Sequence, residues 1–147
     1  MSTVRFTTRR RVEFADTDLS GIVHFTRFFV FMETAEHEFR AARGTELHTE
    51  IDGRVIGWPR VSATCSYKKP AKYGDELDIE IDIERQGEKS LTFGFRFLRS
   101  GELLAEGKLT SVCCVLNDPA GLKAIEIPPA VVERLTGSDE WTAQAKR

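Results

Sequence analysis

Apolar and polar positions alternate along the N-terminal segment 4–14. Successive side chains of a β-strand point to opposite faces, so a period of two gathers the apolar members on one face. The apolar members of this segment are Val4, Phe6, Val12 and Phe14. The alternation therefore predicts a strand that is buried on one face.

A second apolar pattern, in residues 25–43, has the spacing of a helix. Its apolar side chains recur every three or four residues, which places them on one face of an α-helix, and Gly44 follows as a C-terminal stop signal. The members of this stripe are Phe25, Phe28, Phe29, Met32, Ala35, Phe39 and Ala42. The first half is apolar nearly all round, whereas the second half carries Glu36, His37 and Arg40. We therefore expect the N-terminal end of the helix to be deeply buried.

Further strand-like runs fill most of the second half of the chain. The first lies between Pro59 and Pro70, and a proline at each end marks a limit that a hydrogen-bonded ladder does not cross. Three more runs follow in the segment 73–116, each with apolar and polar residues in alternation. Their connections are the turn signals Gln86-Gly87 and Ser100-Gly101. No element is predicted for the polar stretch 45–57.

The order of these elements defines a fold class. A short closing helix is predicted for 127–135, and a single domain for 1–137, with 138–147 as a loose tail. The antiparallel strands leave a sheet with one apolar face, and the phenylalanine-rich helix is the element able to cover it. The sequence predicts an α+β domain in which an antiparallel sheet wraps around one long central helix.

Composition narrows the class of protein. A chain of 147 residues suits one domain, and its net charge of −2 gives no basic bias. The basic run Arg9-Arg10-Arg11 lies in a strand-like pattern that divides it between two faces, so nucleic-acid binding is disfavoured. No apolar run approaches the roughly 18 residues of a membrane span, and we see no signal segment after Met1. We expect a cytoplasmic protein.

Cysteine and histidine give no sign of a metal site. The three cysteines are odd in number and lie in strand-like runs, which suits reduced core residues better than a disulfide framework. The three histidines share no metal-ligand spacing with them. These residues are Cys65, Cys113 and Cys114, and His24, His37 and His48. We predict no metal and no other cofactor.

Two motifs of the chain resemble the hot-dog thioesterases, in the branch typified by 4-hydroxybenzoyl-CoA thioesterase. The motif D-x-D-x-x-G-[IV]-V, which precedes the central helix in that family, stands here as "DTDLSGIV" at 16–23. The turn P-A-x-Y-G-D, which introduces the third strand, stands here as "PAKYGD" at 70–75. The resemblance covers residues 4–116, and it implies a hot-dog fold and an acyl-CoA thioesterase.

The resemblance places the catalytic carboxylate on the second aspartate of the first motif, Asp18. A thioester carbonyl needs a nucleophile or base on one side and hydrogen-bond donors for the oxyanion on the other. The free N–H groups of a buried helix N-terminus, here near His24 and Phe25, are suitable donors. Gly21 allows the chain to turn between them. We predict Asp18 as nucleophile or general base and the Phe25 N–H as an oxyanion donor.

Other roles remain open for several of these residues. An aspartate just before a helix is most often a cap or a turn former, and we assign only such a role to Asp16. Glu33 lies inside the apolar helix, where an unpaired carboxylate is costly. Other hot-dog branches place their catalytic carboxylate on this helix, so Glu33 is the reserve catalytic candidate.

The chain departs from the family pattern at His24-Phe25, where relatives often carry Tyr-His or Trp-Tyr. The polar side chain at the second of these positions is absent, although a backbone amide at Phe25 does not depend on it. His24 either replaces part of that polar function or caps the entrance of the helix, and the two roles remain open.

The resemblance also implies an acyl-CoA substrate and a homodimer or homotetramer in which sheets join edge to edge near each active site. Gly21, Ile22 and Val23 are predicted to contact the substrate. Coenzyme A carries phosphates, which favour basic side chains at one strand end. The basic candidates are Arg60, Lys68, Lys69 and Lys72. Aryl and aliphatic acyl groups remain open, as do two rival functions: a hot-dog hydratase or dehydratase, and a non-catalytic acyl-CoA sensor.

Overall fold

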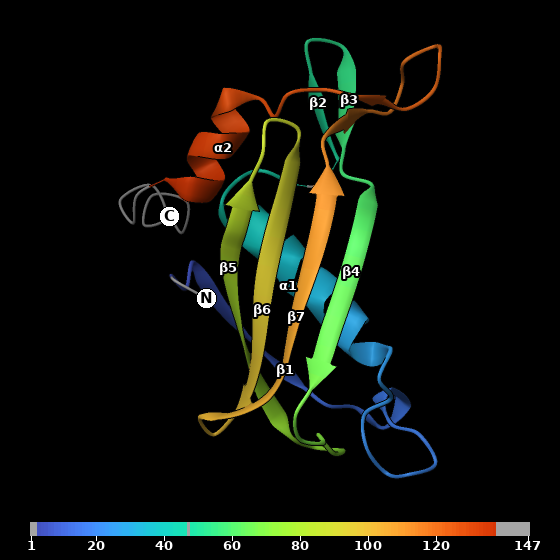
Figure 1. Ribbon diagram of the computed structural model, residues 1–147, viewed down its shortest axis with the longest axis vertical. Coiled ribbons are helices and arrows are strands. Elements are labelled where there is room, and N and C mark those ends of the chain that lie inside the picture. The colour runs from blue at the N-terminus through green and yellow to red at the C-terminus, as the bar shows by residue number, and fades with distance from the viewer. Residues whose placement is uncertain (1–2, 47, 138–147) are drawn as a thin grey trace.

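A five-stranded antiparallel sheet wraps around one long helix in the computed structural model (Figure 1). The strand order is β1-β5-β6-β7-β4. The bounds are Phe6–Arg11 for β1, Arg60–Tyr67 for β4, Glu76–Gln86 for β5, Ser90–Arg99 for β6, Glu102–Val112 for β7 and Arg27–Ala42 for α1. The structure describes residues 3–46 and 48–137, so the tail predicted for 138–147 lies outside it. The predicted α+β arrangement is confirmed.

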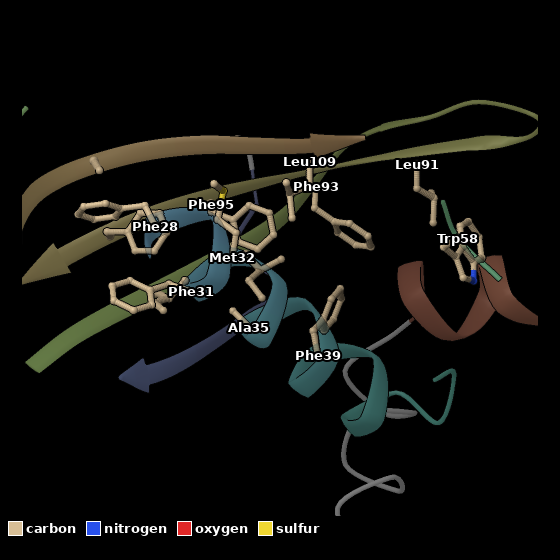
Figure 2. Packing of buried hydrophobic residues seen from close by; sticks show 14 of the residues in the cluster. Phe28, Phe31, Met32, Ala35, Phe39, Trp58, Leu91, Phe93, Phe95 and Leu109 are labelled. Carbon is tan, nitrogen blue, oxygen red and sulfur yellow. The ribbon is translucent and has the colours of Figure 1, made fainter. Parts of the chain in front are cut away.

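The predicted alternation in the sheet corresponds to its two faces. Leu77, Ile79 and Ile81 of β5 are buried, and so are the phenylalanines of β6 that lie beside them in the antiparallel ladder. From α1, Phe28, Met32 and other residues of the stripe point toward this face (Figure 2). Each large side chain buried in this way stabilises the fold by about 1.5–3 kcal/mol.

The helix is shorter than predicted at its N-terminal end. It begins at Arg27, and Phe25 precedes it with 58% of its surface exposed. The prediction that Phe25 belongs to the buried stripe is therefore wrong. Phe31 is fully buried instead, with its ring centre 5.7 Å from that of Phe28 and 6.5 Å from that of Phe97.

The polar second half of α1 is more buried than its composition predicts. Glu36 and Arg40 are both fully buried, and the Arg40 Nε atom donates to Glu36 Oε2 at 2.8 Å. The Arg40 guanidinium also lies 4.3 Å from the centre of the Trp58 ring. Burial is therefore not confined to the N-terminal end, because a paired carboxylate and guanidinium can enter a core that excludes either one alone.

A smaller sheet of four short strands lies beyond the end of the main sheet, in the order β2-β3-β8-β9. Its strands are Thr49–Ile51 (β2), Arg54–Gly57 (β3), Cys114–Val115 (β8) and Lys123–Ala124 (β9). The hairpin β2–β3 covers residues 49–57, in a stretch for which no element was predicted. Its turn is Asp52-Gly53, with positive φ at both residues, which is the turn chemistry of a two-residue hairpin.

The two turns predicted between the strands β5, β6 and β7 are present, and one of them lies slightly later in the chain than predicted. Ser100 and Gly101 form the predicted turn between β6 and β7, both with positive φ. The turn between β5 and β6 occupies 87–89, because β5 continues through Gln86. Helix α2 (Pro129–Thr136) is the predicted closing helix. In the part of the chain that the structure describes, no helix is long and apolar enough to cross a membrane.

The loop between β1 and α1 lies beside the C-terminal end of β4 (Figure 1). It contains the 3-10 helix η1 (Phe14–Asp16) and the first of the two sequence motifs. This placement brings the start of the central helix to the end of an edge strand, where the candidate site is built.

Candidate active site

Backbone hydrogen bonds join the two sequence motifs directly. Ile22 of the first motif forms an isolated antiparallel bridge with Lys72 of the second, and the Val23 N–H donates to the Ala71 carbonyl at 2.8 Å. The second motif is also tied to the end of β1, since Gly74 N–H donates to the Val12 carbonyl at 2.9 Å. Segments about fifty residues apart in sequence thus form one rigid frame.

Asp16 is buried and holds the first motif in place through hydrogen bonds. Its side chain is 1% exposed, and its two oxygens accept from Glu13 N–H and from Arg27 Nε, each at 2.9 Å. Its own carbonyl accepts the His24 N–H at 2.9 Å. These local contacts are those predicted for a residue that holds the loop.

Asp18 has a different environment two residues further on. Its Oδ1 atom accepts the Ser20 N–H at 2.8 Å, and its backbone closes a turn with Gly21 N–H and Ile22 carbonyl. Its Oδ2 atom has no hydrogen-bond partner among residues 3–46 and 48–137. The carboxylate is therefore oriented through one oxygen and open at the other.

A glycine is required at position 21 because of its backbone conformation, and not because a side chain would lack room. Its φ is +79°, in the left-handed region that side chains with a Cβ rarely adopt. A Cβ placed there would meet nothing within 4 Å. The glycine allows the chain to reverse after Asp18 and to enter α1.

The start of α1 presents backbone groups to the same region. Arg27 N–H donates to the His24 carbonyl at 2.9 Å, and Phe29 N–H donates to the Thr26 carbonyl at 3.1 Å. The Phe25 N–H donates to none of the residues that the structure describes. Together with the dipole of the helix, it is a free donor at a positive end.

His24 makes the contacts of a helix-entrance cap. Its Nδ1 atom accepts the Thr26 N–H at 3.3 Å and lies 2.6 Å from Thr26 Oγ1. Its ring stacks on that of Phe25, with centroids 4.7 Å apart. Capping is one of the two roles left open for this residue in the sequence, and these contacts leave only Nε2 for any other.

A cavity of about 460 Å³ lies where these parts meet. Its walls are mostly apolar and aromatic, with one carboxylate and two lysines at the edge. The lining residues are Asp18, Ile22, Val23, Phe25, Phe28, Tyr67, Lys68, Lys69, Pro70 and Ala71. Six residues predicted from sequence share this cavity, and Gly21, His24 and Lys72 adjoin it through the contacts already described.

The lysines of the cavity edge differ in their partners. Lys69 Nζ pairs with Glu102 Oε2 at 2.7 Å, and both side chains are solvent-exposed. Lys68 and Lys72 are also exposed, and neither has an ion pair with a described residue. Lys68 at the cavity edge and Lys72 beside the cavity are therefore available to an anionic ligand.

Two predicted site residues lie elsewhere. Arg60 begins β4, whereas Lys68 follows its last residue, so the prediction that Arg60 and the three lysines share one strand end is wrong. Arg60 instead donates to Glu36 Oε1 at 2.7 Å and lies 3.4 Å from Glu33 Oε2. Glu33 is 55% exposed and outside the cavity lining, so it carries no cost of burial.

A larger groove of about 640 Å³ lies between β1 and α1. It is lined by the arginines Arg9, Arg10 and Arg11 and contains none of the residues predicted for the site. The chemistry-bearing groups are in the smaller cavity, and size alone does not identify the site.

Tyr67 is the residue of the cavity that the sequence interpretation missed. Its hydroxyl donates to the Phe25 carbonyl at 2.8 Å, and its ring packs edge-on against Phe28 with centroids 5.4 Å apart. In sequence it is one more residue of an alternating strand. One feature of the sequence could have indicated its place in the site: Tyr67 directly precedes Lys68-Lys69 and the second motif.

Metal ligands are not gathered in the described part of the chain. No group of three or more histidine, cysteine, aspartate or glutamate side chains there is able to hold a metal ion. All three cysteines are free thiols, and burial raises the pKa of the Cys113 thiol to about 11.

The fold and the site agree with a single family. The chain belongs to the Thioesterase-like superfamily, whose model matches residues 12–135. This finding confirms the family indicated by the two motifs.

Individual relatives extend the match over most of the chain. A putative esterase from Aquifex aeolicus is 31% identical over 88% of this chain and 97% of its own. The 4-hydroxybenzoyl-CoA thioesterase of a Pseudomonas species is 28% identical over 86% of this chain and 94% of its own. A 1,4-dihydroxy-2-naphthoyl-CoA thioesterase from Synechocystis has a similar crystal structure, with a TM-score of 0.81, 26% identity and coverage of 91% and 97%. The hot-dog fold is thereby confirmed.

Proposed function

We propose that this protein hydrolyses acyl-CoA thioesters to a free carboxylic acid and coenzyme A. The observation that carries the proposal is that Asp18 and Phe25, whose N–H donates to no described residue, line the same mostly apolar cavity. Membership of the thioesterase family supports the reaction class. Acyl transfer needs a nucleophile or general base on one side of the carbonyl and a donor for the oxyanion on the other, and we assign these roles to the Asp18 carboxylate and the Phe25 N–H.

Asp18 acts through the carboxylate oxygen that has no partner among the described residues. In one route this oxygen attacks the thioester carbonyl carbon, the C–S bond breaks, coenzyme A leaves as its thiolate, and water hydrolyses the mixed anhydride. In the other route the carboxylate takes a proton from a water that attacks the same carbon, the C–S bond breaks, and coenzyme A leaves as its thiolate, which then takes up a proton. In both routes the negative charge on the carbonyl oxygen is stabilised by the Phe25 N–H and the helix dipole.

The substrate is held by the frame around the cavity. The backbone of Gly21, Ile22 and Val23 passes along the acyl group, and the apolar walls exclude water from it. Lys68 and Lys72, which have no ion pair with a described residue, contact the phosphates of coenzyme A, and Lys69 contributes once it exchanges Glu102 for phosphate.

The protein forms a homodimer or homotetramer. Strand β4 lies at an edge of the main sheet and pairs with β7 alone among the described strands, which leaves its other side open to a second copy. The cavity lies at the end of this strand, so a partner there would adjoin the substrate. Free cysteines and a coenzyme A substrate favour a cytoplasmic location.

The experiment that tests this function is a screen for thiol release. The purified protein is offered aryl and alkyl CoA thioesters, and free coenzyme A is measured with a thiol reagent. We expect steady release from at least one thioester in the panel. Tight binding without release would instead identify an acyl-CoA sensor, and a hydrated or dehydrated thioester product would identify a hydratase or dehydratase.

A further inference from the structure

One backbone carbonyl at the helix entrance has an unusual donor. Phe25 precedes α1, and the N–H that would normally reach its carbonyl, that of Phe29, donates to Thr26 instead. The Phe25 carbonyl accepts the hydroxyl of Tyr67 from the end of β4, at 2.8 Å. A side chain from the sheet therefore replaces the missing helical hydrogen bond.

The two peptide groups that flank Phe25 are held from opposite sides. The His24 carbonyl, which belongs to the same peptide plane as the Phe25 N–H, accepts the Arg27 N–H at 2.9 Å. The following peptide plane is held through its carbonyl by Tyr67. The two planes meet at the Phe25 Cα, so holding both of them restricts the φ and ψ torsions of Phe25 and keeps the plane that carries its N–H from tilting.

Tyr67 is itself well placed for this contact. Its ring packs edge-on against Phe28, the second residue of α1, with centroids 5.4 Å apart. Burial, together with the neighbouring Cys65 thiol, raises the pKa of Tyr67 to about 12. The hydroxyl consequently keeps its proton and remains a donor at any ordinary assay pH.

We propose that Tyr67 is a positioning residue for hydrolysis, which holds Phe25 so that its N–H faces the oxyanion. This inference rests on the proposed function, because it concerns the donor used in that reaction. The hydroxyl does not touch the reacting atoms in this role. It keeps a donor oriented before substrate arrives, which is how preorganised sites stabilise a transition state.

The test is Tyr67→Phe, which removes the hydroxyl and keeps the ring. We expect kcat to fall by about 10- to 100-fold, up to the loss that a misplaced reacting group causes. KM should stay within a factor of about two, because the lost stabilisation belongs to the transition state. The ratio of wild-type to variant kcat should be constant between about pH 6 and pH 9, since the hydroxyl does not ionise there.

Tyr73→Phe is the matched control, since the chain has only two tyrosines. Tyr73 is 61% exposed against 45% for Tyr67, and its ring also packs edge-on, against Phe14. Its hydroxyl has no hydrogen bond to any described residue. We expect this variant to keep wild-type kcat.

A second variant separates the hydroxyl from the ring. Tyr67→Leu removes both, and we expect its kcat to resemble that of Tyr67→Phe. A loss in Tyr67→Leu alone would assign the effect to packing and overturn the proposal. Melting temperatures within about 4 °C of wild type, roughly the effect of one exposed hydrogen bond, confirm that kinetics are compared on folded protein.

Substrate affinity gives an independent reading. In an Asp18→Asn background, adding Tyr67→Phe should leave the dissociation constant of the substrate unchanged by calorimetry. Wild-type kcat in Tyr67→Phe would overturn the positioning role while leaving the proposed function intact. Absence of thiol release from the wild-type protein would overturn the proposed function itself.

Discussion

Two aspartates separated by one residue have opposite environments in this protein. Asp16 is buried and both of its oxygens accept hydrogen bonds, whereas Asp18 is partly exposed and has an oxygen without a described partner. A carboxylate whose acceptors are saturated is a structural element, and one with a free oxygen can attack or accept a proton. In the proposed function, this difference in hydrogen bonding, more than position in the motif, separates the two roles.

Asp18→Asn should remove most hydrolysis while substrate binding and melting temperature stay near wild type. The amide keeps the turn acceptor but loses the charge and the basicity, and such losses typically cost about 10²- to 10⁴-fold in kcat. Steady-state kinetics with one good thioester provide the measurement. Retention of the rate within a factor of about two would show that Asp18 is not the catalytic carboxylate.

Asp118→Asn is the matched control for that variant. Asp118 makes the same turn, with its Oδ1 accepting the Ala120 N–H at 2.9 Å and its carbonyl accepting the Gly121 N–H at 2.9 Å. It lies in the connection between β8 and β9, away from the cavity. We expect wild-type turnover, so a loss in Asp18→Asn alone reports chemistry rather than turn geometry.

Gly21→Val should lower activity, because a β-branched residue is strained at a φ of +79°. Gly121→Val offers a comparison, since Gly121 has a φ of +103° and equally open surroundings. Both variants should lose some stability in a denaturant titration, and only Gly21→Val should lose turnover at a temperature where both are folded. Normal turnover in Gly21→Val would mean that the site tolerates another path between Asp18 and the helix.

At the scale of the element, α1 carries two glutamates with different roles. Glu33 is half-exposed and lies 3.4 Å from Arg60, an arrangement that typically contributes about 0–1 kcal/mol. Glu36, one turn further, is fully buried between Arg40 and Arg60. The first is a surface residue, and the second is part of the core.

Glu33→Gln should cause only a modest loss of kcat, far smaller than that of Asp18→Asn. The amide keeps the size of the side chain, and Glu33 does not line the cavity. Kinetics of both variants on the same substrate, after each is shown to be folded and of equal oligomeric state, decide between them. The reverse order of damage would place the catalytic carboxylate on the helix.

Glu36→Gln should destabilise the protein strongly, because it leaves the buried Arg40 guanidinium without a counter-charge. Removal of one partner of a buried pair typically costs about 3–5 kcal/mol. Urea denaturation measures the free energy of unfolding, with Glu33→Gln as a control that alters the same helix and the same arginine neighbourhood. Equal stability of the two variants would contradict the assigned role of Glu36.

The sequence predicts the elements that have a strong period and misses those that depend on partners. The alternation in β5 to β7 and the spacing in α1 were sufficient to predict the main sheet and its helix. The β2–β3 hairpin was missed because its strands, of three and four residues, are too short to show a period, although Asp52-Gly53 is a recognisable turn. The burial of Glu36 was also not predicted, because it depends on ion pairs with Arg40 of the same helix and with Arg60 of strand β4.

The residues of the candidate site also fall into those that the sequence predicts and those that depend on distant partners. Asp18 and Gly21 belong to a motif and could be predicted. Arg60 was misplaced because a strand of eight residues spans about 26 Å, so Arg60, its first residue, and Lys68, which follows its last residue, lie at opposite ends. Tyr67 was missed because its hydroxyl contacts a carbonyl 42 residues away in sequence, and no local pattern reports such a contact.

At the scale of the whole molecule, the main sheet has a charged outer face and an open edge. Arg96 pairs with Glu80 at 3.1 Å, and Lys108 pairs with Glu84 at 2.8 Å. Strand β4, by contrast, exposes Val61 and has one unpaired side among the described strands. An edge of this kind is a natural surface for strand pairing between copies.

Light scattering on the purified protein should therefore give a mass of two or four chains of 16.6 kDa. The measured mass should stay the same over a wide range of protein concentration, because a sheet that continues across two copies gives them a large shared interface. A mass of one chain at concentrations at which the enzyme is active would rule out assembly as a condition for turnover.

The backbone bridge between the two motifs has a consequence for engineering. Ile22 and Lys72 are joined through main-chain atoms, and Leu19 in the same loop is fully exposed. Amino-acid identity at Leu19 and Ile22 can therefore be varied, proline aside, without breaking the bonds that hold the loop, while Lys72 is kept for the phosphates of coenzyme A. A saturation library at these codons should yield mostly folded enzymes, and selection among them can redirect the protein toward acyl chains that the parent does not accept.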